Sequence, residues 1–181
     1  GTGVTVTVEK QSEYDLDTLL RDVKTKVDAI STFPADAKNP INDQMQYIFD
    51  IGNNHQERVN DRLYPGGIQE RFATEEEGFR RSLEIMSEGG TFIKNMPLVC
   101  WPQGLTGRPD VLEKVEGVPS VFGDFSYRVV EIKSARRLRE SQILQGALYN
   151  RALGLVQGYE PLEFQMVNGD MDVIPVAMVE V

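Results

Sequence analysis

Two acidic residues and a lysine in the second half of the chain have the types and the spacing that metal-assisted chemistry requires. Glu131 and Lys133 are two residues apart in an apolar segment typical of a strand, so their side chains should project from one face while Ile132 packs on the other. Asp110 comes from another expected strand and would bring a second carboxylate beside Glu131. A hard cation such as Mg²⁺ or Mn²⁺ relieves the repulsion between two carboxylates, and the backbone carbonyl of Ile132 can add an oxygen ligand.

A cation held in this way would lower the pKa of a bound water and neutralise charge in a transition state at phosphorus. Lys133 would orient the attacking water, deprotonate it, or stabilise the developing charge, and the sequence leaves these roles open. The simpler alternatives are an exposed ion pair between Glu131 and Lys133 and a turn position for Asp110 after Pro109. The order of the three residues and the motifs that accompany them favour a site.

Gln145 and Tyr149 are one turn apart on the helix expected after the Lys133 strand, so they share a face of that helix. We expect them to hold a water or a phosphate and to position Lys133. The alternative is a solvated glutamine and a half-buried core tyrosine. The adjacent apolar stripe of this helix consists of Leu144, Leu148, Ala152, Leu155 and Val156.

The elements that must position these residues follow from hydrophobic periodicity and turn residues. Helices are expected at 16–30, at 42–63, from a capping box of Thr74 and Glu77 to Gly89, and at 138–156 with Gly158 as the stop. Strands are expected at 4–8, 91–101, 104–115, 127–134, 161–167 and 173–181, with a loop at 32–40 and a turn at 168–170. This order predicts an α/β protein with a mixed sheet and helices on its faces.

Pro109-Asp110 and Glu131-Ile132-Lys133 resemble the motif of the PD-(D/E)XK nuclease superfamily. The spacing of Gln145 and Tyr149 resembles the Gln-x-x-x-Tyr motif of its RecB-like branch, and residues 107–112 and 122–127 are similar to RecB-like nucleases as well. The resemblance covers roughly residues 40 to 181. It implies a restriction-endonuclease-like core with a central mixed sheet, an Mg²⁺ or Mn²⁺ site and hydrolysis of phosphodiester bonds, with DNA favoured as substrate and an exonuclease type of cutting.

Carried over by position, the resemblance implies a role for each motif residue. Asp110 and Glu131 would be metal ligands, with His55, the only histidine, as a further ligand from a helix. Lys133 would be the catalytic lysine, and Gln145 and Tyr149 would be supporting residues. The iron-sulfur members of this branch use four cysteines, whereas this chain has only Cys100, so no cluster is expected.

Composition limits the partners of the protein. The formal net charge of −9 counts against a nucleic-acid binder, although Arg108, Arg136, Arg137 and Arg139 can contact phosphates. Trp101 and Tyr127 can stack on unpaired bases, but core or edge packing is the simpler role for both. No apolar run is long enough to span a bilayer, and one cysteine favours a reducing compartment, so we expect a cytoplasmic protein without a membrane partner.

The domain organisation is expected to be an N-terminal extension, residues 1–40, followed by a nuclease-like domain, residues 41–181, that packs as one unit. The family resemblance implies further domains or protein partners. Two other functions stay open. The chain can be a catalytically inactive nucleic-acid-binding or assembly module with the same fold, or a metal-dependent hydrolase that acts on another substrate.

Overall fold

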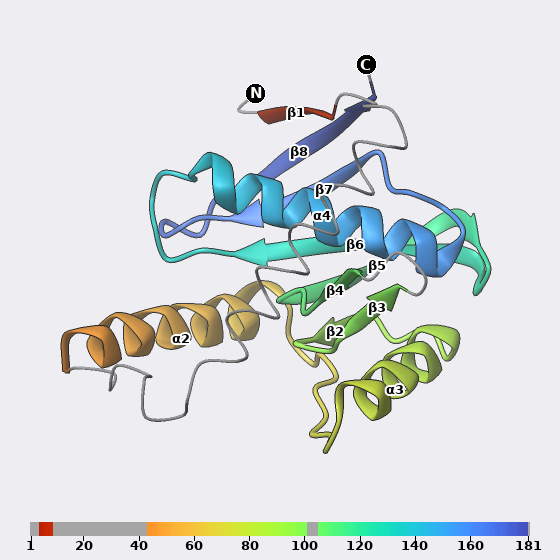
Figure 1. Ribbon diagram of the computed structural model, residues 1–181, viewed down its shortest axis with the longest axis horizontal. Helices are drawn as coiled ribbons and strands as arrows, with labels where there is room; N and C mark the ends of the chain where they lie inside the picture. The colour runs from red at the N-terminus through yellow and green to blue at the C-terminus, as the bar shows by residue number, and fades with distance from the viewer. Residues whose placement is uncertain (1–3, 9–42, 101–104, 181) are drawn as a thin grey trace, which may run out of the picture.

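A six-stranded mixed sheet is the centre of the computed structural model, which describes residues 4–8, 43–100 and 105–180 (Figure 1). The sheet order is β1-β8-β7-β6-β5-β2, and β3 and β4 form a separate two-stranded sheet. The strands are β1 (Val4–Val8), β2 (Phe92–Lys94), β3 (Leu98–Cys100), β4 (Leu105–Gly107), β5 (Val111–Ser120), β6 (Gly123–Ile132), β7 (Glu163–Val167) and β8 (Val173–Glu180). The helices are α2 (Asp43–Leu63), α3 (Glu75–Ser87) and α4 (Glu140–Gln157).

The strand directions show why the sheet is mixed. β5 is antiparallel to both β2 and β6, and β7 is antiparallel to β8. β6 and β7 are parallel, and α4 is the crossover between them, as a parallel pair requires. β1 pairs in parallel with β8 and is an edge strand of this same sheet. The expected mixed sheet is therefore confirmed.

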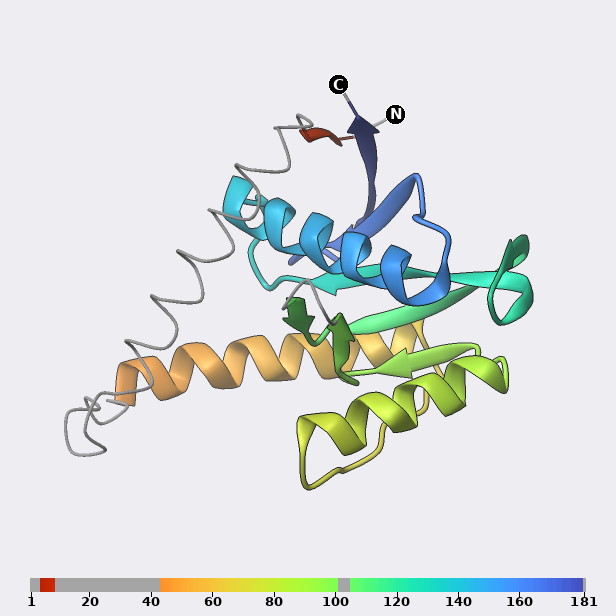
Figure 2. The ribbon, with the colours of Figure 1, turned by 45° about the vertical axis from the view of Figure 1, so that its right-hand side comes forward.

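Two clusters of buried side chains cover the two faces of the sheet, and β6 contributes to both. Tyr127 and Val129 pack with residues of α3 and α4, whereas Val130 and Ile132 pack with Val59 of α2 and its neighbours. Figure 2 shows α4 on one side of β5 and β6 and α2 on the other. Since neighbouring strand residues alternate between faces, Glu131 projects toward the side of α4.

The single strand expected at 91–101 is wrong, because β2 and β3 occupy this segment and belong to different sheets. Asn95, between them, has φ of 51°, which is outside the extended region, and Pro97 has no N–H for a ladder bond. The strand expected at 104–115 is likewise divided into β4 and β5. Pro109 lies between these two strands.

The apolar stripe expected on α4 is largely wrong. Leu144, Leu148 and Leu155 are exposed, and mostly small residues face the sheet instead. A Cβ at Gly146 would clash with the ring of Phe164, so the helix approaches β7 more closely than a leucine stripe would allow. The residues of α4 that are buried are Gly146, Ala147, Asn150, Ala152, Leu153, Gly154 and Gln157.

Several helix ends agree with the sequence. Thr74 is the N-cap of α3 and its Oγ1 accepts from the N–H of Glu77, although the Glu77 carboxylate accepts from Ala73 and not from Thr74. Gly158 ends α4 with φ of 67°. The expected strand at 127–134 begins earlier, at Gly123, and ends at Ile132. The expected helix at 16–30 and the loop at 32–40 lie outside the described residues.

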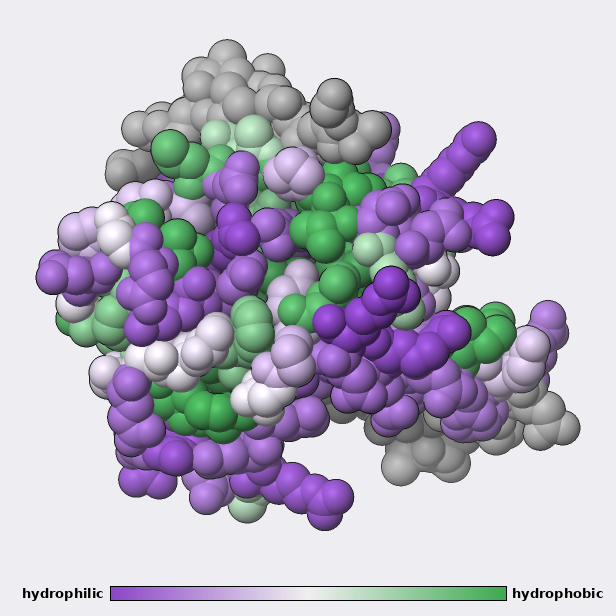
Figure 3. All heavy atoms as spheres, turned by 180° about the vertical axis from the view of Figure 1, so that it is seen from behind, coloured by the Kyte–Doolittle hydropathy of each residue, from purple (hydrophilic) through white to green (hydrophobic). Residues whose placement is uncertain are grey.

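In the part of the chain described here, no helix is long and apolar enough to cross a bilayer. The face opposite to that of Figure 1 shows separate apolar areas among hydrophilic side chains (Figure 3). The first half of α2 contributes exposed apolar residues, namely Met45, Tyr47, Ile48, Phe49 and Ile51.

Candidate active site

Asp110 and Glu131 meet where β5 begins and β6 ends. The register of the two antiparallel strands pairs Val111 with Val130, so Asp110, the residue before β5, lies opposite the end of β6. The backbone N–H of Ile132 donates to Asp110 Oδ2 at 2.7 Å. In return the backbone N–H of Asp110 lies 3.3 Å from Glu131 Oε1 and donates to it. Each carboxylate is therefore held by the backbone of the strand that carries the other one.

Lys133 lies on the same side as Glu131, as the two-residue spacing predicts. Its Nζ donates to Glu131 Oε2 at 2.9 Å and to Gln145 Oε1 at 3.1 Å. The Gln145 amide in turn donates to the hydroxyl of Tyr149 at 3.0 Å. The four side chains thus form one continuous series of hydrogen bonds from the sheet to α4.

Gly107 lets the tyrosine of this series lie close to the backbone. A Cβ at Gly107 would clash with the ring of Tyr149, so only glycine fits between the ring and the end of β4. The sequence signal was the Gly107-Arg108-Pro109-Asp110 motif, but its glycine had no assigned role. The structure supplies one, since Gly107 determines how closely α4 can carry Tyr149 toward the carboxylates.

Burial gives the site unusual electrostatics. Glu131 is only 1% exposed. Burial, and after it the charge of Asp110, raises the pKa of Glu131 to about 7, although Lys133 acts in the opposite direction. Burial also raises the pKa of Asp110, against the N–H of Ile132 and the charge of Lys133. When both are ionised, the buried carboxylate of Glu131 and the half-buried carboxylate of Asp110 exceed the charge of the one ammonium, and a cation would neutralise the excess.

Lys133 keeps its proton in this environment. Burial by itself would lower the pKa of the ammonium, but the charge of Glu131, the hydrogen bond to it, and the charges of Asp110 and Tyr149 together outweigh burial and raise that pKa. A charged ammonium can orient a water or stabilise an oxyanion, but it cannot accept a proton. Of the roles left open by the sequence, a charged Lys133 suits orienting the water and stabilising the developing charge, and does not suit deprotonating the water.

The oxygen donors at the carboxylates suit Mg²⁺ or Mn²⁺. The available donors are the Asp110 and Glu131 carboxylates and the carbonyl of Ile132, all of them hard oxygen atoms. Within the described residues no group of three His, Cys, Asp or Glu side chains could hold a metal. Mg²⁺ commonly binds through one or two carboxylates and keeps several waters, so two carboxylates fit this cation.

The hydrogen bond of His55 does not reach Asp110, Glu131 or Lys133. His55 is buried, and its Nε2 lies 3.1 Å from the backbone oxygen of Asn168. The side chain of α2 that does contact a carboxylate is Gln56, whose Nε2 donates to Asp110 Oδ1 at 2.9 Å. Sequence reasoning missed Gln56, although it lies one turn from the buried Val59 and therefore on the same side of α2.

The arginines are placed differently from one another. Arg108 pairs with Glu75, and its guanidinium lies 4.7 Å from the centre of the Phe72 ring. Arg136 pairs with Asp170 at 3.1 Å. Arg137 and Arg139 are exposed in the segment between β6 and α4, at the end of the sheet that carries the carboxylates.

The two aromatic candidates have separate outcomes. Tyr127 is fully buried and its hydroxyl donates to the backbone oxygen of Gly90 at 2.9 Å. The simpler role in core packing is therefore confirmed for Tyr127. Trp101 lies outside the described residues.

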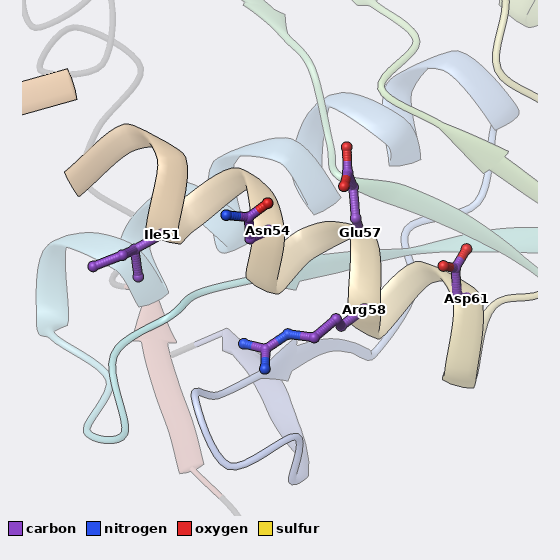
Figure 4. Close-up of a pocket in the computed structure, with 5 residues that line it drawn as sticks. All are labelled: Ile51, Asn54, Glu57, Arg58 and Asp61. Carbon is purple, nitrogen blue, oxygen red and sulfur yellow. The ribbon is translucent and has the colours of Figure 1, made fainter. Parts of the chain in front are cut away.

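An open hollow is lined by residues of α2 (Figure 4). Figure 4 shows the side chains of Glu57 and Asp61 projecting away from that of Arg58, so the hollow has no converging charges. Neither Asp110 nor Glu131 lines it, and we assign the site by the chemistry of the carboxylate pair. The lining residues of the hollow are Ile51, Asn54, Glu57, Arg58 and Asp61.

Comparison with protein-family models and with curated proteins finds no match to this chain.

Proposed function

We propose that the protein is a divalent-metal-dependent nuclease that hydrolyses phosphodiester bonds, with DNA as the favoured substrate. The observation that carries the proposal is the pair of a buried Glu131 and a half-buried Asp110, tied to each other's backbone and flanked by the ammonium of Lys133. The resemblance of the Pro109-Asp110 and Glu131-Ile132-Lys133 motifs to PD-(D/E)XK nucleases, with the RecB-like Gln145 and Tyr149, supports the same reading.

In this proposal the two carboxylates and the Ile132 carbonyl hold Mg²⁺ or Mn²⁺, and no iron-sulfur cluster is involved. A bound cation would supply a water of lowered pKa and would neutralise charge on the phosphate. Lys133, kept charged by Glu131, orients the attacking water or stabilises the developing negative charge. Gln145 and Tyr149 fix the direction of the Lys133 ammonium through their hydrogen bonds.

A cleavage assay with Lys133→Ala tests this proposal. Purified protein with Mn²⁺ should degrade labelled DNA, and the variant should lose about 10²-fold or more in rate, since a charged donor at the reacting phosphate is removed. Single-stranded, duplex and circular substrates should be compared. Circles that stay intact while linear strands are degraded support the exonuclease type.

Lys114→Ala is a matched control. Lys114 also lies in a strand, its side chain is 18% exposed as is that of Lys133, and its Nζ binds the carboxylate two residues away, that of Glu116, at 2.8 Å. This variant should cleave as the wild type does. Equal rates in all three proteins would refute the role of Lys133. Mn²⁺ binding without any cleavage of DNA or RNA would favour a hydrolase of another substrate, and neither binding nor cleavage would favour a non-catalytic module.

A further inference from the structure

In the described part of the chain, Gln56 of α2 is the one helical side chain that donates a hydrogen bond to the Asp110 carboxylate. Its Nε2 donates to Asp110 Oδ1 at 2.9 Å. The other oxygen, Oδ2, accepts from the backbone of Ile132. The two bonds act on different oxygens, so together they determine the rotation of the carboxylate.

Asn95 makes this arrangement rigid. The same Gln56 amide nitrogen donates to Asn95 Oδ1 at 3.1 Å, which uses its second hydrogen. The backbone N–H of Asn95 donates to the backbone oxygen of Asp110 at 3.1 Å. Asn95 adopts φ of 51°, a conformation that asparagine tolerates better than most residues. Asn95 thus contacts Gln56 through its side chain and Asp110 through its backbone.

We propose that Gln56, supported by Asn95, is the positioning residue that fixes Asp110 for cation binding. This inference rests on the proposed function. The amide is neutral, so it aligns the carboxylate without adding charge that would compete with a cation. Its two N–H groups are both occupied, which leaves only one rotation of the amide that satisfies Asp110 and Asn95 together. Residues that orient a metal ligand in this way typically contribute about tenfold to a hundredfold in metal affinity.

Gln56→Ala should therefore bind Mn²⁺ about tenfold more weakly than the wild type, measured by calorimetry on the metal alone. At limiting Mn²⁺ its cleavage rate should fall, and a large excess of Mn²⁺ should restore most of that rate. A merely structural role would give the opposite pattern, with lower stability, unchanged Mn²⁺ affinity in the folded fraction and no rescue by added metal.

Gln46→Ala is a matched control on the same helix. Gln46 also donates through Nε2 to an aspartate oxygen at 2.9 Å, that of Asp50, but in an exposed pair within α2. Its Mn²⁺ affinity should equal that of the wild type. Gln56→Met keeps the length of the side chain without a donor, and it should show the same weakened binding if Gln56→Ala does not fold.

The outcomes separate the inference from the proposed function. Wild-type protein that takes up no Mn²⁺, or takes it up equally well as Asp110→Asn, would overturn both. Wild-type protein that binds Mn²⁺ through Asp110, with Gln56→Ala and Gln56→Met binding as tightly as Gln46→Ala, would overturn the role of Gln56 alone.

Discussion

At the scale of single residues, the two carboxylates are costly to the fold in the absence of a cation. Glu131 is buried and Asp110 is half-buried, and the effect of burial and mutual repulsion on them is only partly offset by Lys133. The backbone N–H groups of Ile132 and of Asp110 itself hold the carboxylates in place in spite of this repulsion. A site of this kind stores unfavourable electrostatic energy that binding of a cation would release.

The raised pKa of Glu131 predicts how the free energy of unfolding depends on pH when a chelator keeps the protein free of metal. The pKa of Glu131 in the folded protein, about 7, is above its usual value of 4.5. The folded state therefore holds the proton more tightly, and the stability that this contributes is fully present below pH 4.5 and is lost as the pH rises through 7. Between pH 5 and pH 8 the wild type should lose on the order of 2 kcal/mol relative to Glu131→Gln, measured by urea unfolding.

The comparison needs an acidic residue whose removal leaves this effect in place. Glu116→Gln serves, because Glu116 is a strand residue paired with Lys114 and its side chain is 76% exposed. It should keep the pH dependence of the wild type. If Glu131→Gln kept it as well, the raised pKa of Glu131 would be wrong.

The residues of the site differ in how far the sequence could predict them. The common side of Glu131 and Lys133 follows from the fixed two-residue period of a strand and is confirmed. The position of Asp110 beside Glu131 depends on the register of β5 and β6. The order of the motifs suggested that the two residues meet, but the register itself cannot be worked out from the sequence. Gln56 depends on where α2 lies against β2 and β5. His55, which the family resemblance implies as a ligand, has its hydrogen bond with the backbone oxygen of Asn168.

At the scale of elements, α4 illustrates why periodicity alone fails. Three leucines at helical spacing predicted the buried face, yet glycine and alanine lie against the sheet and the leucines are exposed. Gln157 is fully buried in the same helix and binds both the N–H and the carbonyl of Tyr127, which continues the bonding pattern of β6. Which side chains of α4 are buried depends on the distance between this helix and the sheet, and the local sequence pattern does not determine that distance.

Two helical glycines give opposite predictions for the same substitution. Gly146→Ala should destabilise the protein by about 1–3 kcal/mol, because the added Cβ would clash with Phe164 and push α4 from β7. Gly52→Ala in α2 meets no atom within 4 Å, so the better helix propensity of alanine should stabilise the protein by up to about 1 kcal/mol. Urea unfolding of both variants measures the two free energies.

Helix propensity alone would predict that both alanine variants are more stable. A stabilised Gly146→Ala protein would show that α4 can shift away from the sheet without loss. Gln145 and Tyr149 would then be able to move with α4, although hydrogen bonds join them to each other and to Lys133. The stability of this variant therefore also tests how firmly α4 holds these two side chains at the site.

At the scale of the whole molecule, the net charge of −9 would repel the proposed nucleic-acid substrate, so local positive charge would have to overcome this repulsion. The segment between β6 and α4 places Arg137 and Arg139 at the end of the sheet where the carboxylates lie. The proposed cation would add positive charge at the same end. Binding of a negatively charged strand should therefore depend on a small region rather than on the overall charge.

Charge reversal tests this with a single-stranded oligonucleotide in the Lys133→Ala background, where cutting does not interfere. Arg137→Glu with Arg139→Glu should weaken binding and lower the slope of log affinity against log salt by about 1.4, since two phosphate contacts are lost at roughly 0.7 each. Arg62→Glu with Arg80→Glu changes the net charge equally at exposed positions on α2 and α3 and should leave the slope unchanged. Equal losses in the two pairs, measured by fluorescence anisotropy, would mean that overall charge governs binding and that residues 137–139 do not form the phosphate contact.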